Sequence, residues 1–235
     1  MKTILITGAS EGLGKEIAKV LSRENNVVII SNNEEKLRKA ALEVKAKSFY
    51  VCDIRDFKNI DKVFNEVIKK YKKIDCLINN AGIWLQGNFE ENSYEEVKNV
   101  LDVNLFGTIA CAKAIIPHMK KRKSGQIINI ASNIAIEPEA FAPIYSISKQ
   151  AVETYRRCVQ NDLASNGIYM TNFCPGLMPT QIFKKAGNHI PEDVMQKCGL
   201  DLKLAALEVK SIIDSFGKIW KPTVQVKNPN DIGIS

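Results

Sequence analysis

The chain has 235 residues, of which 45% are hydrophobic and 25% charged, a composition that excludes a disordered or fibrous protein. Its 33 Lys and Arg residues outnumber its 26 Asp and Glu residues, so the formal net charge is +7, which raises the question of an anionic partner without deciding it. No apolar run reaches the roughly 18 residues that a membrane helix needs, and the apolar start is too short for a signal peptide. We therefore expect a cytoplasmic protein.

Strand-like and helix-like segments alternate along the chain. Short runs rich in Ile and Val, typical of strands buried on both faces of a parallel sheet, occur at Thr3–Thr7, Asn26–Ser31, Ser48–Cys52, Asp75–Asn79, Gln126–Ala131 and Ile168–Cys174. The segments between them are expected to be helices, at Gly12–Arg23, Glu34–Lys45, Lys58–Tyr71, about 94–121 and Ile144–Ser165. This alternation predicts a Rossmann-like, doubly wound parallel α/β sheet in three layers, with residues 1–235 forming a single dinucleotide-binding and catalytic domain.

The C-terminal part is less regular. Residues 180–199 are expected to form a loop or short helices and Leu202–Phe216 a helix, so that about 180–216 make up a substrate loop and helix. A last strand is expected at Thr223–Val226, and the polar tail 227–235 is expected to fray. The six cysteines form no C-x-x-C pair, and His, Cys and acidic residues nowhere show metal-ligand spacing, so we expect reduced thiols and no metal.

The first predicted strand ends in a glycine-rich turn, T-G-A-S-E-G-L-G at Thr7–Gly14, which leads into a helix. Glycines let the backbone approach phosphates closely, and the helix N-terminus supplies N–H groups and a positive dipole end. The spacing differs from G-x-G-x-x-G, and the Lys-Ser/Thr ending of an ATP phosphate loop is missing. The turn therefore predicts a dinucleotide pyrophosphate site, with a glycine turn that binds no ligand as the alternative.

Further motifs follow this turn in order, and together they resemble those of the short-chain dehydrogenase/reductase family. They cover the chain to about residue 180, and they are Asp53, N-N-A-G at Asn79–Gly82, Asn104, Ser132, Y-S-I-S-K at Tyr145–Lys149 and P-G-L-M-P-T at Pro175–Thr180. The resemblance implies an NAD(P)-dependent oxidoreductase that transfers a hydride between a nicotinamide cofactor and an alcohol or carbonyl substrate. Two positions depart from the common family pattern on the loop that leads to the substrate pocket: Ala135 replaces a Gly and Ala131 a Ser.

The same resemblance implies the cofactor contacts. The glycine turn would line the pyrophosphate site, Asp53 would meet the adenine edge, the N-A-G residues would flank the adenosine ribose, and Thr180 would lie near the nicotinamide carboxamide. The full expected set is Gly8, Ser10, Glu11, Gly12, Leu13, Gly14, Ser31, Asn32, Asp53, Ile54, Asn80, Ala81, Gly82, Tyr145, Lys149, Pro175, Gly176, Met178 and Thr180.

Four residues are expected to be catalytic: Asn104, Ser132, Tyr145 and Lys149. Tyr145 and Lys149 are four apart on one helix face, so the Lys ammonium and a positive nicotinamide ring should lower the phenol pKa and make Tyr145 the general acid/base. Ser132 follows a predicted strand at the carboxyl edge of the sheet, where its hydroxyl can donate to a substrate oxygen. The resemblance assigns Asn104 to a water that relays protons to Lys149. Taken singly, these residues also fit a buried aromatic, a turn residue and a backbone-bonded amide in a helix kink.

The choice between NAD and NADP depends on the end of the second predicted strand, where an acid binds the ribose 2′-hydroxyl and an Arg attracts a 2′-phosphate. Ser31 stands where NAD-preferring relatives often carry an acid, and Asn32 where NADP-preferring relatives often carry Arg. Glu11 occupies a position where some NADP relatives place Lys or Arg. Either cofactor is expected, and the balance leans slightly to NAD.

Mainly apolar residues near these motifs are expected to face the substrate, which indicates an apolar or mixed alcohol or carbonyl compound: Trp84, Ile134, Phe141, Leu177, Ile182 and Phe183.

Many basic residues fall at predicted helix C-termini, at 69–73 and 120–123, where they meet the negative dipole end. We therefore expect neither a nucleic-acid nor a membrane partner. Family relatives commonly associate through two long helices, which implies a homodimer or homotetramer. The alternative function is a non-catalytic NAD(P)-binding or sensor protein of the same fold, and nucleic-acid binding through the basic surplus is a further one.

Overall fold

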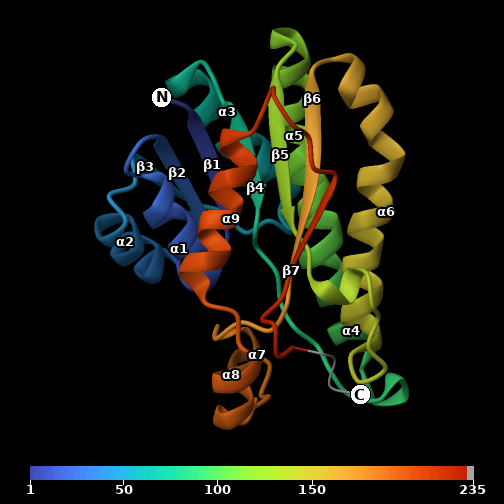
Figure 1. Cartoon of the computed structure of the whole chain (residues 1–235). Coiled ribbons are helices and arrows are strands. Elements are labelled where there is room, and N and C mark those ends of the chain that lie inside the picture. The colour runs from blue at the N-terminus through green and yellow to red at the C-terminus, as the bar shows by residue number, and fades with distance from the viewer. Residues whose placement is uncertain (232–235) are drawn as a thin grey trace.

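Seven parallel strands form one sheet in the computed structural model, which describes residues 1–231 (Figure 1). The strands are β1 (Thr3–Thr7), β2 (Asn26–Ser31), β3 (Ser48–Val51), β4 (Cys76–Asn79), β5 (Gly125–Ile130), β6 (Ile168–Pro175) and β7 (Thr223–Val226). Their order is β3-β2-β1-β4-β5-β6-β7. The chain runs outward from β1 to β3, returns to β4 beside β1, and then runs outward to β7. This reversal is the switch point at which open α/β sheets bind ligands.

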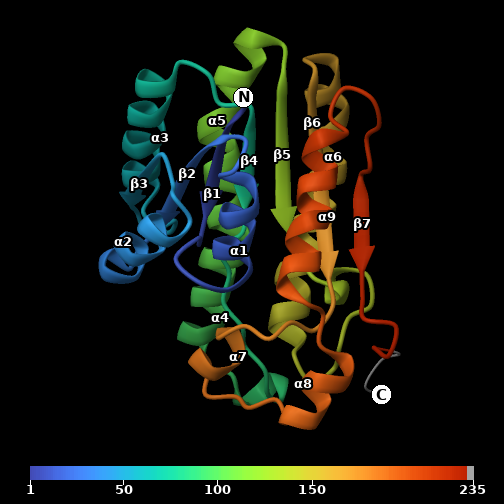
Figure 2. The ribbon, with the colours of Figure 1, turned by 60° about the vertical axis from the view of Figure 1, so that its left-hand side comes forward.

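Helices cover both faces of this sheet, which explains why its strands read as continuous apolar runs. All residues of β1, β4 and β5 are buried. Because side chains alternate along a strand, Ile4 and Ile6 pack into one helical layer and Leu5 into the other. One layer holds α1 (Gly12–Leu21), α2 (Glu34–Glu43) and α9 (Leu202–Asp214), and the other holds α3 (Phe57–Tyr71), α5 (Thr108–Arg122) and α6 (Pro143–Ser165) (Figure 2). The predicted Rossmann-like fold is confirmed, and the predicted strand bounds differ by one residue at most.

The long helix expected at about 94–121 is interrupted. It consists of α4 (Tyr94–Leu101), a π-helical turn at Asp102–Gly107, and α5. The Thr108 hydroxyl bonds the Asn104 carbonyl oxygen at 2.9 Å, and Gly107 lies so close to Ile54 that a Cβ there would come within 2.6 Å of its Cδ1 atom. A π-turn adds a residue to the helical repeat and often marks a functional site; here it turns the Asn104 side chain into the interior, where Asn104 is 1% exposed.

The stretch Tyr94–Arg122 is, by length and composition alone, apolar enough to cross a membrane, with a mean hydropathy of 1.5 over its best window. The expectation that no segment meets such a criterion was therefore too strict. Within the fold, its apolar side chains Cys111, Ala112, Ile115 and Met119 belong to the core cluster that also holds strand residues of β4 and β5. Packing against the sheet accounts for the composition of this stretch.

Basic residues close the helices that precede β4 and β5. Lys72 and Lys123 adopt left-handed backbone conformations, with φ of 60° and 49°, at the C-termini of α3 and α5. Arg122 donates to the Ile74 carbonyl oxygen at 2.7 Å and pairs with Asp75 at 3.1 Å. These groups lie at the amino ends of the strands, so this part of the basic surplus is on the opposite edge of the sheet from the glycine turn.

The C-terminal region folds beside the carboxyl edge of the sheet. Two short helices, α7 (Ile182–Lys185) and α8 (Glu192–Cys198), interrupt the segment between β6 and α9, and β7 pairs in parallel with β6. The tail was expected to fray, but hydrogen bonds hold its described part. Asn228 donates to the Gly199 carbonyl oxygen at 2.9 Å, and Asn230 donates to the Lys197 carbonyl oxygen at 3.3 Å. The remainder, 232–235, lies outside the described residues.

Candidate active site

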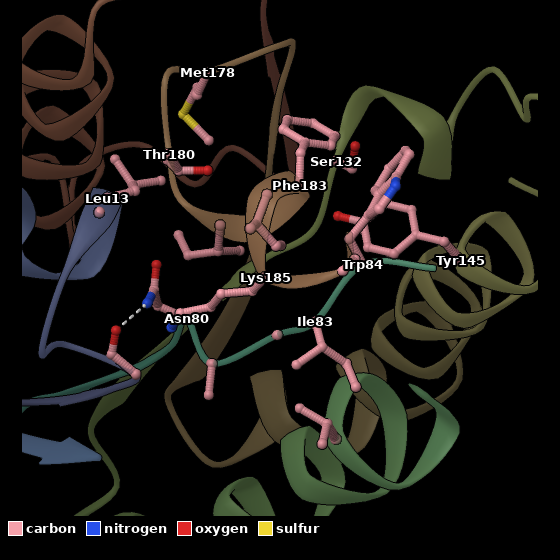
Figure 3. A pocket seen from close by; sticks show the side chains of 18 of the residues that line it. Leu13, Asn80, Ile83, Trp84, Ser132, Tyr145, Met178, Thr180, Phe183 and Lys185 are labelled. Atoms are coloured by element: carbon pink, nitrogen blue, oxygen red, sulfur yellow. Dashed lines mark hydrogen bonds between the residues drawn. The ribbon is translucent and has the colours of Figure 1, made fainter. Parts of the chain in front are cut away.

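A cleft of about 900 Å³ lies at the carboxyl edge of the sheet, between the glycine turn and the segment from Gly176 to Asp201, which we call the substrate loop (Figure 3). Its volume suits a bound small molecule or cofactor. Nearly all the residues predicted to bind cofactor or substrate line it. Gly14 and Asn104 are the exceptions within the described chain, and both stand one layer behind the cleft wall. The topology thus brings residues from the ends of all seven strands to one place.

The glycine turn is held against the end of β4 by Asn80. The Asn80 side-chain amide donates to the carbonyl oxygens of Thr7 and Gly8, each at 3.0 Å. Gly8 has a φ of 64°, and a Cβ there would come within 2.6 Å of the Ala81 Cα atom. A Cβ at Gly14 would come within 2.4 Å of the Asn80 amide nitrogen. Glycine is therefore required at both positions by the contact between the turn and β4, and the start of α1 faces the cleft.

Ser132, Tyr145 and Lys149 meet at the other end of the cleft. Ser132 follows β5, while Tyr145 and Lys149 occupy successive turns of α6, which begins at Pro143; proline suits the first helical position. All three are buried. The Lys149 ammonium donates to the Ile130 carbonyl oxygen at 3.0 Å and lies 5.6 Å from the centre of the Tyr145 ring.

Burial dominates the electrostatics of this group. It raises the pKa of the Tyr145 phenol, an effect that the neighbouring Ser132 hydroxyl opposes, and it lowers the pKa of Lys149 to about 8. The expectation that Lys149 would lower the Tyr145 pKa does not hold for the protein alone, because the ammonium bonds the Ile130 carbonyl oxygen and desolvation of a phenolate is the larger effect. Near neutral pH, Tyr145 is therefore a neutral phenol beside a charged Lys149.

Asn104 links three segments behind these residues. Its side-chain oxygen accepts from the Ile83 N–H at 2.8 Å, and its amide donates to the Ile83 carbonyl oxygen at 2.9 Å and to the Ser148 hydroxyl at 3.0 Å. Ser148 in turn donates to the Tyr145 carbonyl oxygen at 2.7 Å. A Cβ at Gly82 would lie 3.3 Å from Asn104 Oδ1 and 3.4 Å from Lys149 Nζ, so both side chains border this glycine. This geometry makes Asn104 a positioning residue for the start of α6, and its contact with a relay water stays a prediction.

The far end of the cleft, beside β2, carries cations that sequence reasoning missed. The predicted Ser31 hydroxyl lies 3.0 Å from that of Ser10. Arg55 bonds both carboxylate oxygens of Asp53 and holds the pKa of Asp53 below its usual value. Lys36, at the start of α2, donates to the Glu11 carboxylate at 2.9 Å. The proximity of Arg55 to Asp53 in the sequence was an available signal, whereas the Lys36 contact depends on the fold.

An aromatic group covers the substrate end. The Trp84 ring centre lies 4.5 Å from that of Tyr145, 4.8 Å from that of Phe183 and 6.2 Å from that of Phe141 (Figure 3). All the predicted substrate-facing residues line the cleft. The structure adds Lys227, which pairs with Glu137 at 2.6 Å. No sequence pattern pointed to this residue, because its segment has the composition of a polar tail.

A parallel sheet with a glycine turn at its switch point, and a buried Ser, Tyr and Lys at the same edge, defines a Rossmann-like oxidoreductase. The family model described as short chain dehydrogenase matches residues 2–191. The chain therefore belongs to the short-chain dehydrogenase family, as the sequence motifs predict.

One relative and two solved structures are similar to this chain. An uncharacterized oxidoreductase of Staphylococcus epidermidis is 32% identical over 181 residues, which are 76% of this chain and 79% of that protein. An alcohol dehydrogenase from the archaeon Thermococcus sibiricus, complexed with 5-hydroxy-NADP, has the same fold, with a TM-score of 0.89, 21% identity and full coverage of both chains. A 3-ketoacyl-(acyl-carrier-protein) reductase from Brucella melitensis, complexed with NADH, gives a TM-score of 0.88, 24% identity and 98% coverage of both chains.

Proposed function

We propose that the protein is an NAD(P)-dependent oxidoreductase that transfers a hydride between a nicotinamide cofactor and an alcohol or carbonyl substrate. The observation that carries the proposal is the meeting of Ser132, Tyr145 and Lys149 in a cleft whose other end is the glycine turn. The nicotinamide dinucleotides bound by two proteins of the same fold support it. When bound, such a cofactor supplies or accepts the hydride.

The residues of the cleft fit a dinucleotide. The turn at Gly8–Gly14 would hold the pyrophosphate at the start of α1, Asp53 and Ile54 would bound the adenine, and Asn80–Gly82 would flank the adenosine ribose. The segment Pro175–Thr180 would bound the nicotinamide. The close fit of Gly8 against Ala81 holds the turn against the end of β4, beside the start of α1.

The proton chemistry is assigned to Tyr145. As a neutral phenol it donates its proton to a carbonyl oxygen during reduction and, as phenolate, accepts one from an alcohol during oxidation. The Lys149 charge stabilises the phenolate that reduction leaves behind. The Ser132 hydroxyl bonds the Asn133 side chain at 3.1 Å and donates instead to the substrate oxygen as negative charge develops there.

For the cofactor, we favour NADP over the slight lean to NAD that the sequence alone suggests. The end of β2 offers the neutral Ser31 and Asn32, so it presents no carboxylate to repel a 2′-phosphate. Lys36 and Arg55 line the same part of the cleft, each paired with a carboxylate, and supply the cationic groups that a 2′-phosphate requires there. Lys36 is the expected partner of the 2′-phosphate.

The aromatic group around Trp84 supports an apolar or mixed substrate. Self-association through α4, α5 and α6 remains our proposal. It is supported by Phe106, in the turn between α4 and α5, and by Ile147 on α6, which are 49% and 51% exposed. Light scattering after gel filtration tests for the dimer or tetramer. We also propose that the protein acts in the cytoplasm.

Calorimetric titration with NAD, NADH, NADP and NADPH, followed by an alcohol and carbonyl panel with the tightest of them, tests the proposed function. We expect submillimolar to micromolar binding and turnover of at least one apolar substrate. Binding without turnover of any compound would favour the sensor alternative, and absence of binding to all four dinucleotides would overturn the proposal.

A further inference from the structure

Glu11 joins three segments at the mouth of the cleft. Its Oε2 atom accepts from Lys36 Nζ, at the start of α2, at 2.9 Å. Its Oε1 atom pairs with Nζ of Lys185, the last residue of α7 in the substrate loop. The glycine turn, α2 and the substrate loop thus meet at a single carboxylate, although Glu11 and Lys185 are 174 positions apart in the chain.

The charges of this triad favour an additional anion. One carboxylate faces two ammonium groups, so the cluster carries a net positive charge beside the N-terminus of α1, where Glu11 is the N-cap residue. The three side chains are partly exposed, and exposed ion pairs contribute little to stability. A pairing of this kind can exchange partners when a more strongly charged anion arrives.

Lys185 is positioned so that its ammonium group can pair with an anion bound in the cleft. Its side chain lines the cleft on the side of Asn80 (Figure 3). The substrate loop already touches the glycine turn at a second point, since a Cβ at Gly12 would lie 3.5 Å from the Thr180 methyl group. Phe183, two residues before Lys185, packs on Trp84 at the substrate end. One short helix therefore connects the glycine turn with the aromatic group that covers Tyr145.

We propose that Lys185 is a cofactor-binding residue supplied by the substrate loop: its ammonium exchanges the Glu11 carboxylate for the diphosphate of the dinucleotide. The exchange couples cofactor binding to ordering of the substrate loop over the substrate. The diphosphate is the anion of choice because it carries two charges and is expected at the start of α1, beside Glu11. Lys36 remains the proposed partner of the 2′-phosphate beside β2. This inference rests on the proposed nicotinamide-dependent function.

ADP-ribose, which carries the diphosphate without the nicotinamide, is the probe that tests the exchange, with AMP as the probe that lacks the diphosphate. Calorimetry on Lys185→Met, which removes the charge and keeps the apolar stem, should show about tenfold weaker ADP-ribose binding, the loss typical of one charge-assisted hydrogen bond. AMP binding should change less. Lys184→Met, at the exposed neighbouring lysine, should bind both as the wild type does, and Lys185→Arg should retain most of the affinity.

Hydrogen exchange supplies a readout independent of activity. ADP-ribose should slow amide exchange across residues 182–198 in the wild type and in Lys184→Met, but much less in Lys185→Met. Glu11→Gln should bind ADP-ribose at least as tightly as the wild type, because the carboxylate that competes for Lys185 is gone.

Wild-type affinity and wild-type loop protection in Lys185→Met would overturn the exchange while leaving the proposed function intact. If the unaltered protein binds neither ADP-ribose nor any nicotinamide dinucleotide, the proposed function itself fails.

Discussion

The indole of Trp84 lies over the phenol of Tyr145, with ring centres 4.5 Å apart and ring planes inclined by 53°. Trp84 comes from the loop after β4 and Tyr145 from the first turn of α6. The contact excludes water from one side of the phenol, and burial is what raises the Tyr145 pKa. An aromatic residue in the substrate end of the cleft thus contributes to the burial that raises the pKa of the proposed acid.

Replacing Tyr145 by Phe removes the proton donor and keeps the ring that packs on Trp84. We expect turnover to fall by about 10²–10⁴-fold, the usual contribution of general acid–base catalysis, while the dissociation constant of the cofactor changes little. Steady-state kinetics on a substrate identified in the panel, with calorimetry for the cofactor, measure both. Near-normal turnover by a folded Tyr145→Phe protein would contradict the assignment.

Replacing Trp84 by Ala opens the substrate end and exposes the phenol. We expect the KM for apolar substrates to rise and the free energy of unfolding to fall by about 3 kcal/mol, as for a buried aromatic residue. Because water then reaches Tyr145, its pKa should fall, which spectrophotometric titration of the phenol can detect. Trp84→Phe is the control that keeps an aromatic ring. Its KM and its free energy of unfolding should lie between those of the wild type and those of Trp84→Ala. An unchanged KM in Trp84→Ala would place the substrate elsewhere in the cleft.

Lys149 makes the free energy of unfolding depend on pH in the alkaline range. Burial lowers its pKa from 10.5 to about 8, so between these values the unfolded chain holds a proton that the folded protein has lost. Stability from this group therefore rises with pH from about 8 to 10.5, and the cost of burying the charge is fully present below 8. We expect the free energy of unfolding of the wild type, relative to Lys149→Met, to increase by roughly 1–3 kcal/mol between pH 7 and 10. Urea denaturation at a series of pH values measures the difference, and a constant difference would contradict the burial effect.

Asn104 should matter for stability as well as for rate. Removing its side chain in Asn104→Ala leaves the partly buried Ile83 N–H without an acceptor and the Ser148 hydroxyl without its donor, which should cost about 2–4 kcal/mol. Because Ser148 bonds the backbone of Tyr145, kcat should also fall while the KM stays near the wild-type value. Asn99→Ala, whose amide bonds Arg55 at the surface, serves as the control and should change stability by about 0.5 kcal/mol or less. Equal stability of the two variants would argue against the positioning role.

The sheet and the glycine turn could be predicted from the sequence because their determinants are local. Continuous Ile and Val runs specify buried parallel strands, and the turn at Thr7–Gly14 carries its own conformational requirement at Gly8. From the sequence, an interruption near Asn104 could be raised only as an alternative, a backbone-bonded amide in a helix kink, because its cause is tertiary: the bonds of Asn104 to Ile83 and Ser148.

The residues of the candidate site likewise fall into those that local sequence identifies and those that only the fold brings together. Ser132, Tyr145 and Lys149 follow family motifs, so the sequence identifies them. Lys36 and Lys185 carry no local signal, and their meeting at Glu11 depends on how α2 and the substrate loop fold against the glycine turn. The rise of the Tyr145 pKa in the protein without cofactor could not be predicted, because the extent of burial is a property of the packed structure.

Ser31, the last residue of β2, should control the proposed preference for NADP. Its hydroxyl lies 3.0 Å from that of Ser10, in the glycine turn, so a carboxylate introduced by Ser31→Asp would lie beside the ribose. It would accept hydrogen bonds from the ribose hydroxyls of NAD and repel the 2′-phosphate of NADP. We expect the ratio of NADP affinity to NAD affinity to fall at least tenfold, measured by calorimetry with both cofactors, and Lys36→Met to lower NADP affinity while sparing NAD. Ser31→Asn, which adds a side chain of the same shape without charge, is the control. If Ser31→Asp leaves the affinity ratio unchanged, the ribose lies away from the end of β2 and Lys36 has no 2′-phosphate to bind.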